Sequence, residues 1–466
     1  DFSEQLTPIA LAIPEAASTL PDFLAETRWQ LEWLLAMQYA DGSGRFSNAL
    51  KSPEFAGFVL PESDASPIAL ATASSMGTAV AAAVLAQAAR VYRAYDAAFA
   101  DRCEQAATLA YGWLSANPGM LTPAQDWAAA YDYVATPGDA TAQQLEAAAR
   151  LWAAAEIWGT TASDAALSDF EARAEAAAYA FSSAPDWVDP SDLGIITYLR
   201  SDSARRRADV RDGLSASVLA AAAALRQAHD APDNAWGRAQ GYWWGANGTT
   251  ARSCLVLQMA ERLEAGAAWM DLCAEQIGYL LGRNPYGRSQ VTGIGVDPPE
   301  HPHHRPSSAD ASLPAWPGLL VGGPQQNGAE WLDWTDEESD YLTNETAINW
   351  NAALVYALAG FLAEDPGTPE PLETDSALGA AMTECGVPGD TRTDAGTSQP
   401  DSGDPGLADV APPAARSAPS AGCGCHVAEP RAASAAGPLA GLGLWLAAYL
   451  RRRRATRRPT TGSRAG

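Results

Sequence analysis

The chain has 466 residues, of which 47% are hydrophobic, so it is long enough to bury a large core. Its formal net charge of −26 makes nucleic acid and anionic membranes poor partners for the folded part. A neutral substrate fits this charge better. The chain has sixteen tryptophans and nine phenylalanines, and this ratio favours a sugar ligand, because the flat indole ring stacks on the apolar faces of sugar rings. Ordinary core packing also uses tryptophan, and many of the sixteen fit that simpler interpretation.

Helical periodicity dominates the first 282 residues. The chain begins at Asp1, without Met or a signal peptide, and we expect that an upstream part is absent. Strand signals are nearly absent and no short repeat is visible. Successive helices joined by loops of unequal length therefore predict an all-α toroid or bundle rather than a parallel sheet. Apolar residues recur with the period of a helix in residues 23–38, 71–95, 99–115, 142–158, 162–183, 206–229, 249–265 and 268–282.

Between residues 282 and 344 the helical pattern stops. A loop of this length inside a compact domain is usually functional. It holds three of the five histidines, His301, His303 and His304, followed by Arg305. Zinc is disfavoured, because the cluster lacks an acidic or Cys complement and helical spacing. Two interpretations stay open: hydrogen bonds to a hydroxyl-rich substrate, or a cluster that braces the loop.

A last helix is predicted from the apolar face of residues 348–362, with Thr343 or Asn344 as its N-cap. Glu345 then falls in the first turn and Asp336 on the loop before it. A carboxylate in this place is ordinarily a cap or a dipole partner. To act as a general acid it needs a raised pKa, which the helix dipole opposes. Only burial against nearby aromatic side chains would offset the dipole, and the candidates are Trp334, Tyr341 and Trp350.

Two stretches carry a family resemblance. The first reads Ser289-x-Val291-Thr292-x-x-Gly295 and ends in Pro302-His303-x-Arg305. The second reads Trp334-x-Asp336, Tyr341, Glu345-x-Ala347 and Asn351-Ala352. In this order they resemble the two signatures of glycoside hydrolase family 9, the endoglucanase-type cellulases. The likeness runs from about residue 13 to residue 364, and one position departs from it, since Asp297 stands where a basic residue or Asn is usual.

The resemblance implies an (α/α)6 barrel and hydrolysis, with inversion, of β-1,4-glucosidic bonds in cellulose or a related β-glucan. It makes Glu345 the general acid and Asp336 a supporting carboxylate, with His303 and Arg305 beside the scissile bond. No cofactor is predicted, and a structural calcium is left open. Together with Arg305, the predicted substrate-binding residues are Trp244, Trp316, Trp334 and Tyr341.

The resemblance does not extend to the catalytic base, because this sequence lacks the segment that carries it in the family. Inversion needs a second carboxylate, which the family carries in an Asp-Ala-Gly-Asp segment upstream of the region equivalent to Ile13. No such segment occurs here, and Asp394-Ala395-Gly396 is followed by Thr397. We therefore expect an N-terminally truncated enzyme. The alternatives are a carbohydrate-binding pseudoenzyme that has lost its base, and an exo-acting β-glucosidase or glucosaminidase of the same fold.

The composition changes after residue 364, which we expect to end the catalytic domain, residues 1–364. Residues 365–421 are rich in Pro, Gly, Ser, Thr and Asp, which predicts a disordered linker. Residues 422–466 hold Cys423 and Cys425, a short apolar run and an arginine cluster. They resemble the C-terminal sorting tails of myxobacterial surface proteins, where such a Cys is the point of processing and lipid attachment. The tail predicts export to the cell surface or the medium, with the sorting machinery or the membrane as a partner of a monomer, although a plain C-terminal anchor fits as well.

The remaining cysteines show no metal-binding spacing. Cys103, Cys254 and Cys273 fall in helical patterns and are predicted to be buried thiols, and Cys385 lies in the linker. Export would permit a disulfide, but the spacing does not establish one.

Overall fold

The computed structural model describes residues 20–52, 56–123, 140–186, 188–310, 314–328 and 330–362. The chain divides into two units, Asp1–Leu372 and Glu373–Gly466. The predicted linker and tail, with Cys385, Cys423 and Cys425, lie outside the described residues. Within the described ranges, no helix combines the length and the apolar character that crossing a membrane would need.

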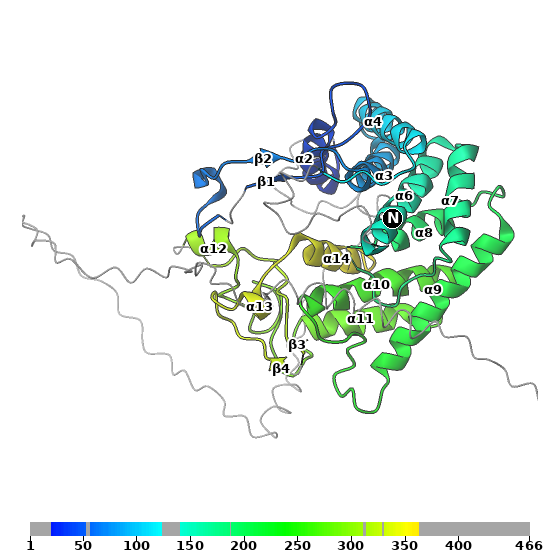
Figure 1. Ribbon diagram of the computed structural model, residues 1–466. Coiled ribbons are helices and arrows are strands. Elements are labelled where there is room, and N and C mark those ends of the chain that lie inside the picture. Colours follow the sequence, from blue (N-terminus) through cyan, green and yellow to red (C-terminus); the bar gives the residue numbers. More distant parts are fainter. Residues whose placement is uncertain are drawn as a thin grey trace, which may run out of the picture. The chain divides into compact units, whose positions relative to one another are not determined.

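The described part of the first unit is built mainly from helices in two sets (Figure 1). Taken in chain order, the contacts between helices are as follows: α3 packs against α4 and α6, α6 packs against α7 and α8, and α10 packs against α9, α11 and α14. The inner set is α3 (Ser75–Tyr92), α6 (Ala140–Thr161), α8 (Ser191–Arg200), α10 (Ala246–Leu263) and α14 (Ile348–Ala359). The outer set is α2 (Asp22–Ala36), α4 (Ala97–Ala116), α7 (Asp164–Ala176), α9 (Ala208–His229) and α11 (Trp269–Leu280).

The inner helices, together with α2 of the outer set, surround a cavity of about 1070 Å³. Each of them contributes apolar side chains to its wall, and examples are Val84, Trp152, Ile196, Leu255 and Val355. Inner helices joined through outer ones around a shared axis agree with the predicted (α/α)6 barrel, of which the described residues supply five inner helices.

Most predicted helices are present, with ends shifted by a few residues. The helix predicted over residues 162–183 is present as α7 but is shorter at both ends, and Ala162, with a left-handed backbone conformation (φ 54°), separates it from α6. Ser163 then caps a separate helix by accepting a hydrogen bond from the Ala166 N–H. Helix α8 was not predicted at all, since its ten residues present too short an apolar pattern.

The region between residues 282 and 344 contains no long helix, as predicted, but it is not structureless. It holds the one-turn helices α12 (Arg305–Ala309) and α13 (Tyr341–Asn344), and a hairpin of β3 (Gln325–Asn327) and β4 (Glu330–Leu332). The strands pair antiparallel with Gln326 opposite Trp331. A second pair, β1 (Leu50–Lys51) and β2 (Ala69–Leu70), flanks the 3-10 turn η1 (Pro61–Ser63).

The structure corrects the prediction for two of the cysteines. Cys254 of α10 and Cys273 of α11 form a disulfide, because these neighbouring helices bring their Cα atoms to 5.0 Å. Cys103 is a buried thiol as predicted, and burial raises its pKa to about 11. It is therefore protonated and inert at neutral pH.

Candidate active site

Glu345 lies in an extended segment between α13 and α14, with φ −68° and ψ 153°. The predicted place in the first turn of a helix is wrong, because α14 begins only at Ile348. The segment is fixed on both sides by the long loop: the His303 N–H donates to the Asn344 carbonyl at 2.9 Å, and the Gly322 N–H donates to the Glu345 carbonyl at 2.8 Å. Since Glu345 is outside the first turn, the dipole argument against a raised pKa no longer applies to it.

The side chain of Glu345 is half-buried, and this burial raises the pKa of its carboxyl group above the ordinary value. Three groups act in the opposite direction on the pKa. The Trp244 indole N–H donates to Oε2 of Glu345 at 3.2 Å, and the charges of His303 and Arg305 favour the carboxylate. Burial is the largest of these effects, so Glu345 keeps its proton to a higher pH than an exposed glutamate does, as a general acid requires.

Exposed aromatic rings surround Glu345. The ring of Trp244 lies 6.0 Å from that of Tyr341, and Tyr341 lies 6.1 Å from the ring of His303. The ring of Phe58 lies 5.7 Å from that of His303, edge to face. Trp244, Tyr341 and Phe58 are each about half exposed, which leaves apolar faces open to a ligand beside the carboxyl group.

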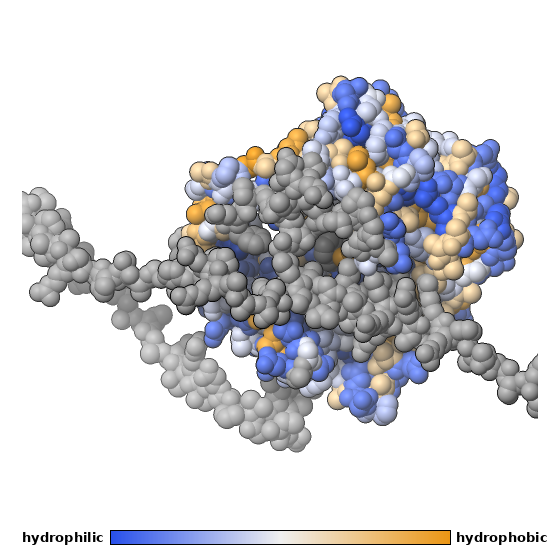
Figure 2. Space-filling view, viewed as in Figure 1, coloured by the Kyte–Doolittle hydropathy of each residue, from blue (hydrophilic) through white to orange (hydrophobic). Residues whose placement is uncertain are grey.

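Phe58 was not predicted as a site residue. It lies between β1 and β2, in a segment whose sequence shows only Gly, Ser and Pro enrichment. An exposed aromatic residue in such a loop was the available signal. Figure 2 shows hydrophobic surface, coloured orange, where Figure 1 places β1, β2 and η1.

Two of the predicted site residues, His303 and Arg305, lie where the long loop enters α12. Nδ1 of His303 lies 2.6 Å from the Glu338 carbonyl oxygen, and because a carbonyl only accepts, Nδ1 carries a proton. Nε2 of the same ring is then left for a ligand. Arg305 is the first residue of α12 and is half-buried. Trp316, which is 43% exposed, packs edge-on at 5.1 Å against the next histidine, His304.

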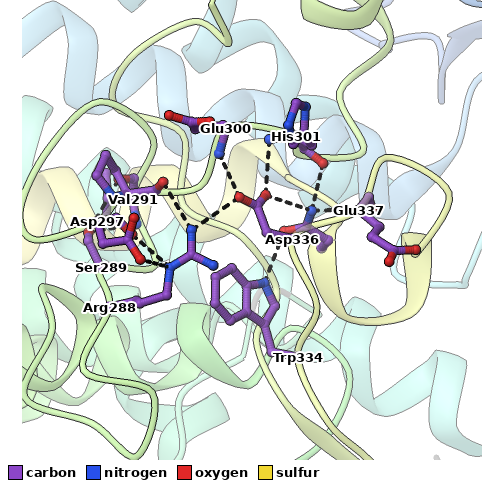
Figure 3. A network of polar contacts seen from close by, with 11 residues as sticks. Arg288, Ser289, Val291, Asp297, Glu300, His301, Trp334, Asp336 and Glu337 are labelled. Carbon is purple, nitrogen blue, oxygen red and sulfur yellow. Dashed lines mark hydrogen bonds and ion pairs between the residues drawn. The ribbon is translucent and has the colours of Figure 1, made fainter. Parts of the chain in front are cut away.

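Asp336 fixes the position of the loop that carries His301, His303 and His304, here called the histidine loop. Its carboxylate accepts the backbone N–H groups of Glu300 at 2.8 Å and His301 at 3.0 Å, and Arg288 lies 3.3 Å from the same carboxylate. Figure 3 shows Asp336 at the centre of this network. Because both oxygens already accept hydrogen bonds, Asp336 fits a supporting carboxylate better than a base that activates water.

Trp334 belongs to the same bracing network. It is only 5% exposed, and its indole N–H donates to Oδ1 of Asn344 at 3.0 Å. The Asn344 amide in turn donates to the His301 carbonyl at 2.7 Å. The prediction that Trp334 contacts the substrate is therefore wrong, because its ring has no open face.

The described residues hold no cluster of metal-binding side chains. No three His, Cys, Asp or Glu side chains within them converge on a point that would hold a metal ion, so nothing in this part supports calcium or zinc. The cavity among the inner helices reaches Thr346 and Ala347 behind Glu345, but its wall is mainly apolar. A hydroxyl-rich ligand fits the polar and aromatic surface around Glu345 better than this cavity.

The sequence is similar to a known enzyme family and to several of its members. The family model described as Glycosyl hydrolase family 9 matches residues 4–358. Endoglucanase D of Acetivibrio thermocellus is 39% identical over 363 residues, which make up 78% of this chain and 56% of that protein. A xyloglucan-specific endo-β-1,4-glucanase of Bacteroides ovatus is 32% identical over 373 residues, 75% of this chain and 62% of that protein. The chain thus spans about half the length of endoglucanase D.

Solved structures show the same similarity in three dimensions. A metagenome-derived glycoside hydrolase family 9 endoglucanase superposes with a TM-score of 0.64 and 31% identity, covering 78% of this chain and 67% of that one. A thermostable endoglucanase of Alicyclobacillus acidocaldarius, carrying the substitution D468A, gives a TM-score of 0.65 and 28% identity over 78% of this chain and 71% of that one.

Proposed function

The chain belongs to glycosyl hydrolase family 9, and from this premise we propose that it hydrolyses β-1,4-glucosidic bonds of cellulose or a related β-glucan, within the polymer and with inversion. The names of its relatives support this substrate class, since one is an endoglucanase and another a xyloglucan-specific endo-β-1,4-glucanase. The aromatic surface around Glu345 and the net charge of −26 suit such a neutral polymer.

The observation that carries the proposal is the environment of Glu345. Its carboxyl group, whose pKa burial raises, donates a proton to the oxygen of the leaving sugar. The carboxylate that remains is then stabilised by the Trp244 N–H and by the positive charges of His303 and Arg305. These contacts favour the charged state more than the neutral one, so they assist the transfer itself.

The catalytic base is proposed to be a carboxylate other than Asp336. The two oxygens of Asp336 accept backbone N–H groups of the histidine loop, which leaves this residue a positioning role. The base would come from a segment outside the described residues, in line with the family's Asp-Ala-Gly-Asp motif, which these 466 residues lack. A pseudoenzyme that binds glucan without cleaving it is the second candidate, and the missing motif is what favours it.

The test is the release of reducing sugar from carboxymethylcellulose by the protein that carries the proposed base segment, and by its variants. Glu345→Gln keeps the size and the hydrogen bond to Trp244 but removes the acid, so kcat is expected to fall by about 10²- to 10⁴-fold. Glu338→Gln is the matched control, since this exposed carboxylate lies on the neighbouring loop. Turnover by Glu345→Gln close to that of Glu338→Gln would remove Glu345 from the acid role. If the unsubstituted protein that carries this segment binds cello-oligosaccharides without cleaving any glucan, the pseudoenzyme is the better description.

Export is a further part of the proposal. The Cys254–Cys273 disulfide supports it, because disulfides form and persist mainly in oxidising compartments. The sequence of residues 422–466 supports attachment to the cell surface through Cys423 or Cys425, with the sorting machinery as partner.

A further inference from the structure

The β3–β4 hairpin carries an exposed tryptophan that has no assigned role. Trp331 is 52% exposed, and its ring lies 4.8 Å from that of Tyr242, edge to face at 68°. Tyr242 precedes Trp244, the indole that bonds to Glu345, by two residues. We propose that Trp331, held by Tyr242, is an additional stacking platform for a sugar ring of the β-glucan, away from the bond that is cleaved. This inference rests on the proposed function.

The platform is fixed from beneath by a buried cation. The guanidinium carbon of Arg238 lies 4.2 Å from the centre of the Tyr242 ring, and Arg238 is only 3% exposed. Its Nε donates to Thr250 of α10 at 3.0 Å, whereas neither Nη atom has a hydrogen-bond partner. A buried charge of this kind gains most from the face of an aromatic ring. Tyr242 is therefore held against the helix, and Trp331 rests on a rigid neighbour rather than on a mobile loop.

The hairpin is also connected to the residues around Glu345. The Gln326 N–H donates to the Tyr242 carbonyl at 3.3 Å, which joins β3 to the loop that carries Trp244. The side-chain amide of Gln325 donates to the Leu342 carbonyl, next to Tyr341. Because β3 contacts both segments, these two hydrogen bonds fix the hairpin against the segments that carry Trp244 and Tyr341. A glucan chain that is long enough can then contact Trp331 while one of its bonds lies at Glu345.

The chemistry of the platform matches a pyranose ring. A half-exposed indole offers a flat apolar face and an N–H group, which suits the alternating C–H and hydroxyl surfaces of a sugar. Pre-organisation by Tyr242 reduces the conformational entropy that binding would otherwise cost. A platform away from the cleaved bond should make the expected gain depend on ligand length.

The test compares the binding of cellotriose and cellohexaose by titration calorimetry, with Glu345→Gln present in every chain to prevent cleavage. Trp331→Ala is expected to weaken cellohexaose binding by about 3- to 10-fold, the range of one aromatic contact, and to weaken cellotriose binding less. Trp331→Phe should recover part of the loss, because it restores an aromatic face. Trp29→Ala is the control: this tryptophan is 79% exposed on α2, which Figure 1 shows on the side of the unit away from the hairpin.

Each outcome separates the platform from the proposed function. If cellohexaose binds Trp331→Ala as tightly as it binds Trp29→Ala, the platform is refuted while the function stands. Equal losses for cellotriose and cellohexaose would also refute it, since they would indicate a general disturbance of the site. If the chain with only Glu345→Gln binds neither sugar, the proposed function fails and the platform fails with it.

Discussion

The carboxyl group of Glu345 is subject to opposing influences. Burial raises its pKa, whereas the Trp244 N–H and the charges of His303 and Arg305 lower it, with burial dominant. The folded chain then binds this proton more tightly than the unfolded chain, whose glutamate has the ordinary pKa of 4.5. The contribution of Glu345 to stability is thus present below that pH and is lost as the pH rises through the folded pKa. Placing an acid here costs stability at neutral pH, which is common at functional sites.

The first prediction concerns the hydrogen bond from Trp244. In Trp244→Phe the carboxylate of Glu345 loses its donor while burial remains, so the pKa of Glu345 should rise. The protonated acid would persist to higher pH, and the basic limb of the kcat/KM profile should move upward. The measurement is hydrolysis of a soluble cello-oligosaccharide as a function of pH by the protein that carries the proposed base segment.

Trp316→Phe serves as the control for that profile. Trp316 packs on His304 and makes none of the described contacts with Glu345, so the basic limb should keep its position even if binding weakens. A basic limb that stays in place or moves to lower pH in Trp244→Phe would contradict the assignment of Glu345 as the acid.

At the scale of elements, one glycine decides where the Trp244 loop meets α10. Gly245 has φ +73°, and a Cβ atom at this position would lie 2.4 Å from the ring of Trp350. Only glycine allows α10 to begin directly after Trp244 while α14 packs this closely. The position of the indole donor therefore depends on the contact between two inner helices.

The second element-scale feature is the disulfide between α10 and α11, which encloses a sequence separation of 19 residues. Replacing both cysteines, Cys254→Ser with Cys273→Ser, should lower the free energy of unfolding by about 3 kcal/mol, mainly because the unfolded chain becomes less constrained. Chemical denaturation with and without dithiothreitol measures this. The unsubstituted chain should lose stability on reduction and the double variant should not. Equal sensitivity of both proteins to dithiothreitol would contradict the disulfide.

At the scale of the whole molecule, the acidic charge and the exposed aromatic rings suit a protein that works on a neutral polymer outside the cell. The inner and outer helices give the surface around Glu345 a rigid support, since the inner helices are among the most buried elements described. The segments that hold Glu345, His303 and Trp331 are loops attached to that ring, as is usual for functional residues.

The tail proposal makes a prediction for the whole chain. Deletion of residues 422–466 should release the protein into the medium, because both cysteines and the apolar run would be removed. Cell fractionation and immunoblotting of producing cells would measure this. Cys423→Ser with Cys425→Ser should act similarly if lipid attachment holds the protein, whereas retention of this variant at the surface would favour a plain anchor. Continued cell association of the deleted form would refute both.

The sequence by itself determined most of the helices and predicted Glu345 as the acid, because helical periodicity and the two signatures are local patterns. It placed the break between α6 and α7 within a few residues of Ala162, but it missed α8, whose ten residues show too short an apolar pattern. Only the tertiary structure decided which aromatic residues are open: Trp334 is buried by Asn344 and Tyr286, whereas Phe58 and Trp331 are exposed. The disulfide and the extended segment at Glu345 likewise depend on contacts between residues far apart in the chain. Such contacts follow from packing, which no short stretch of sequence contains.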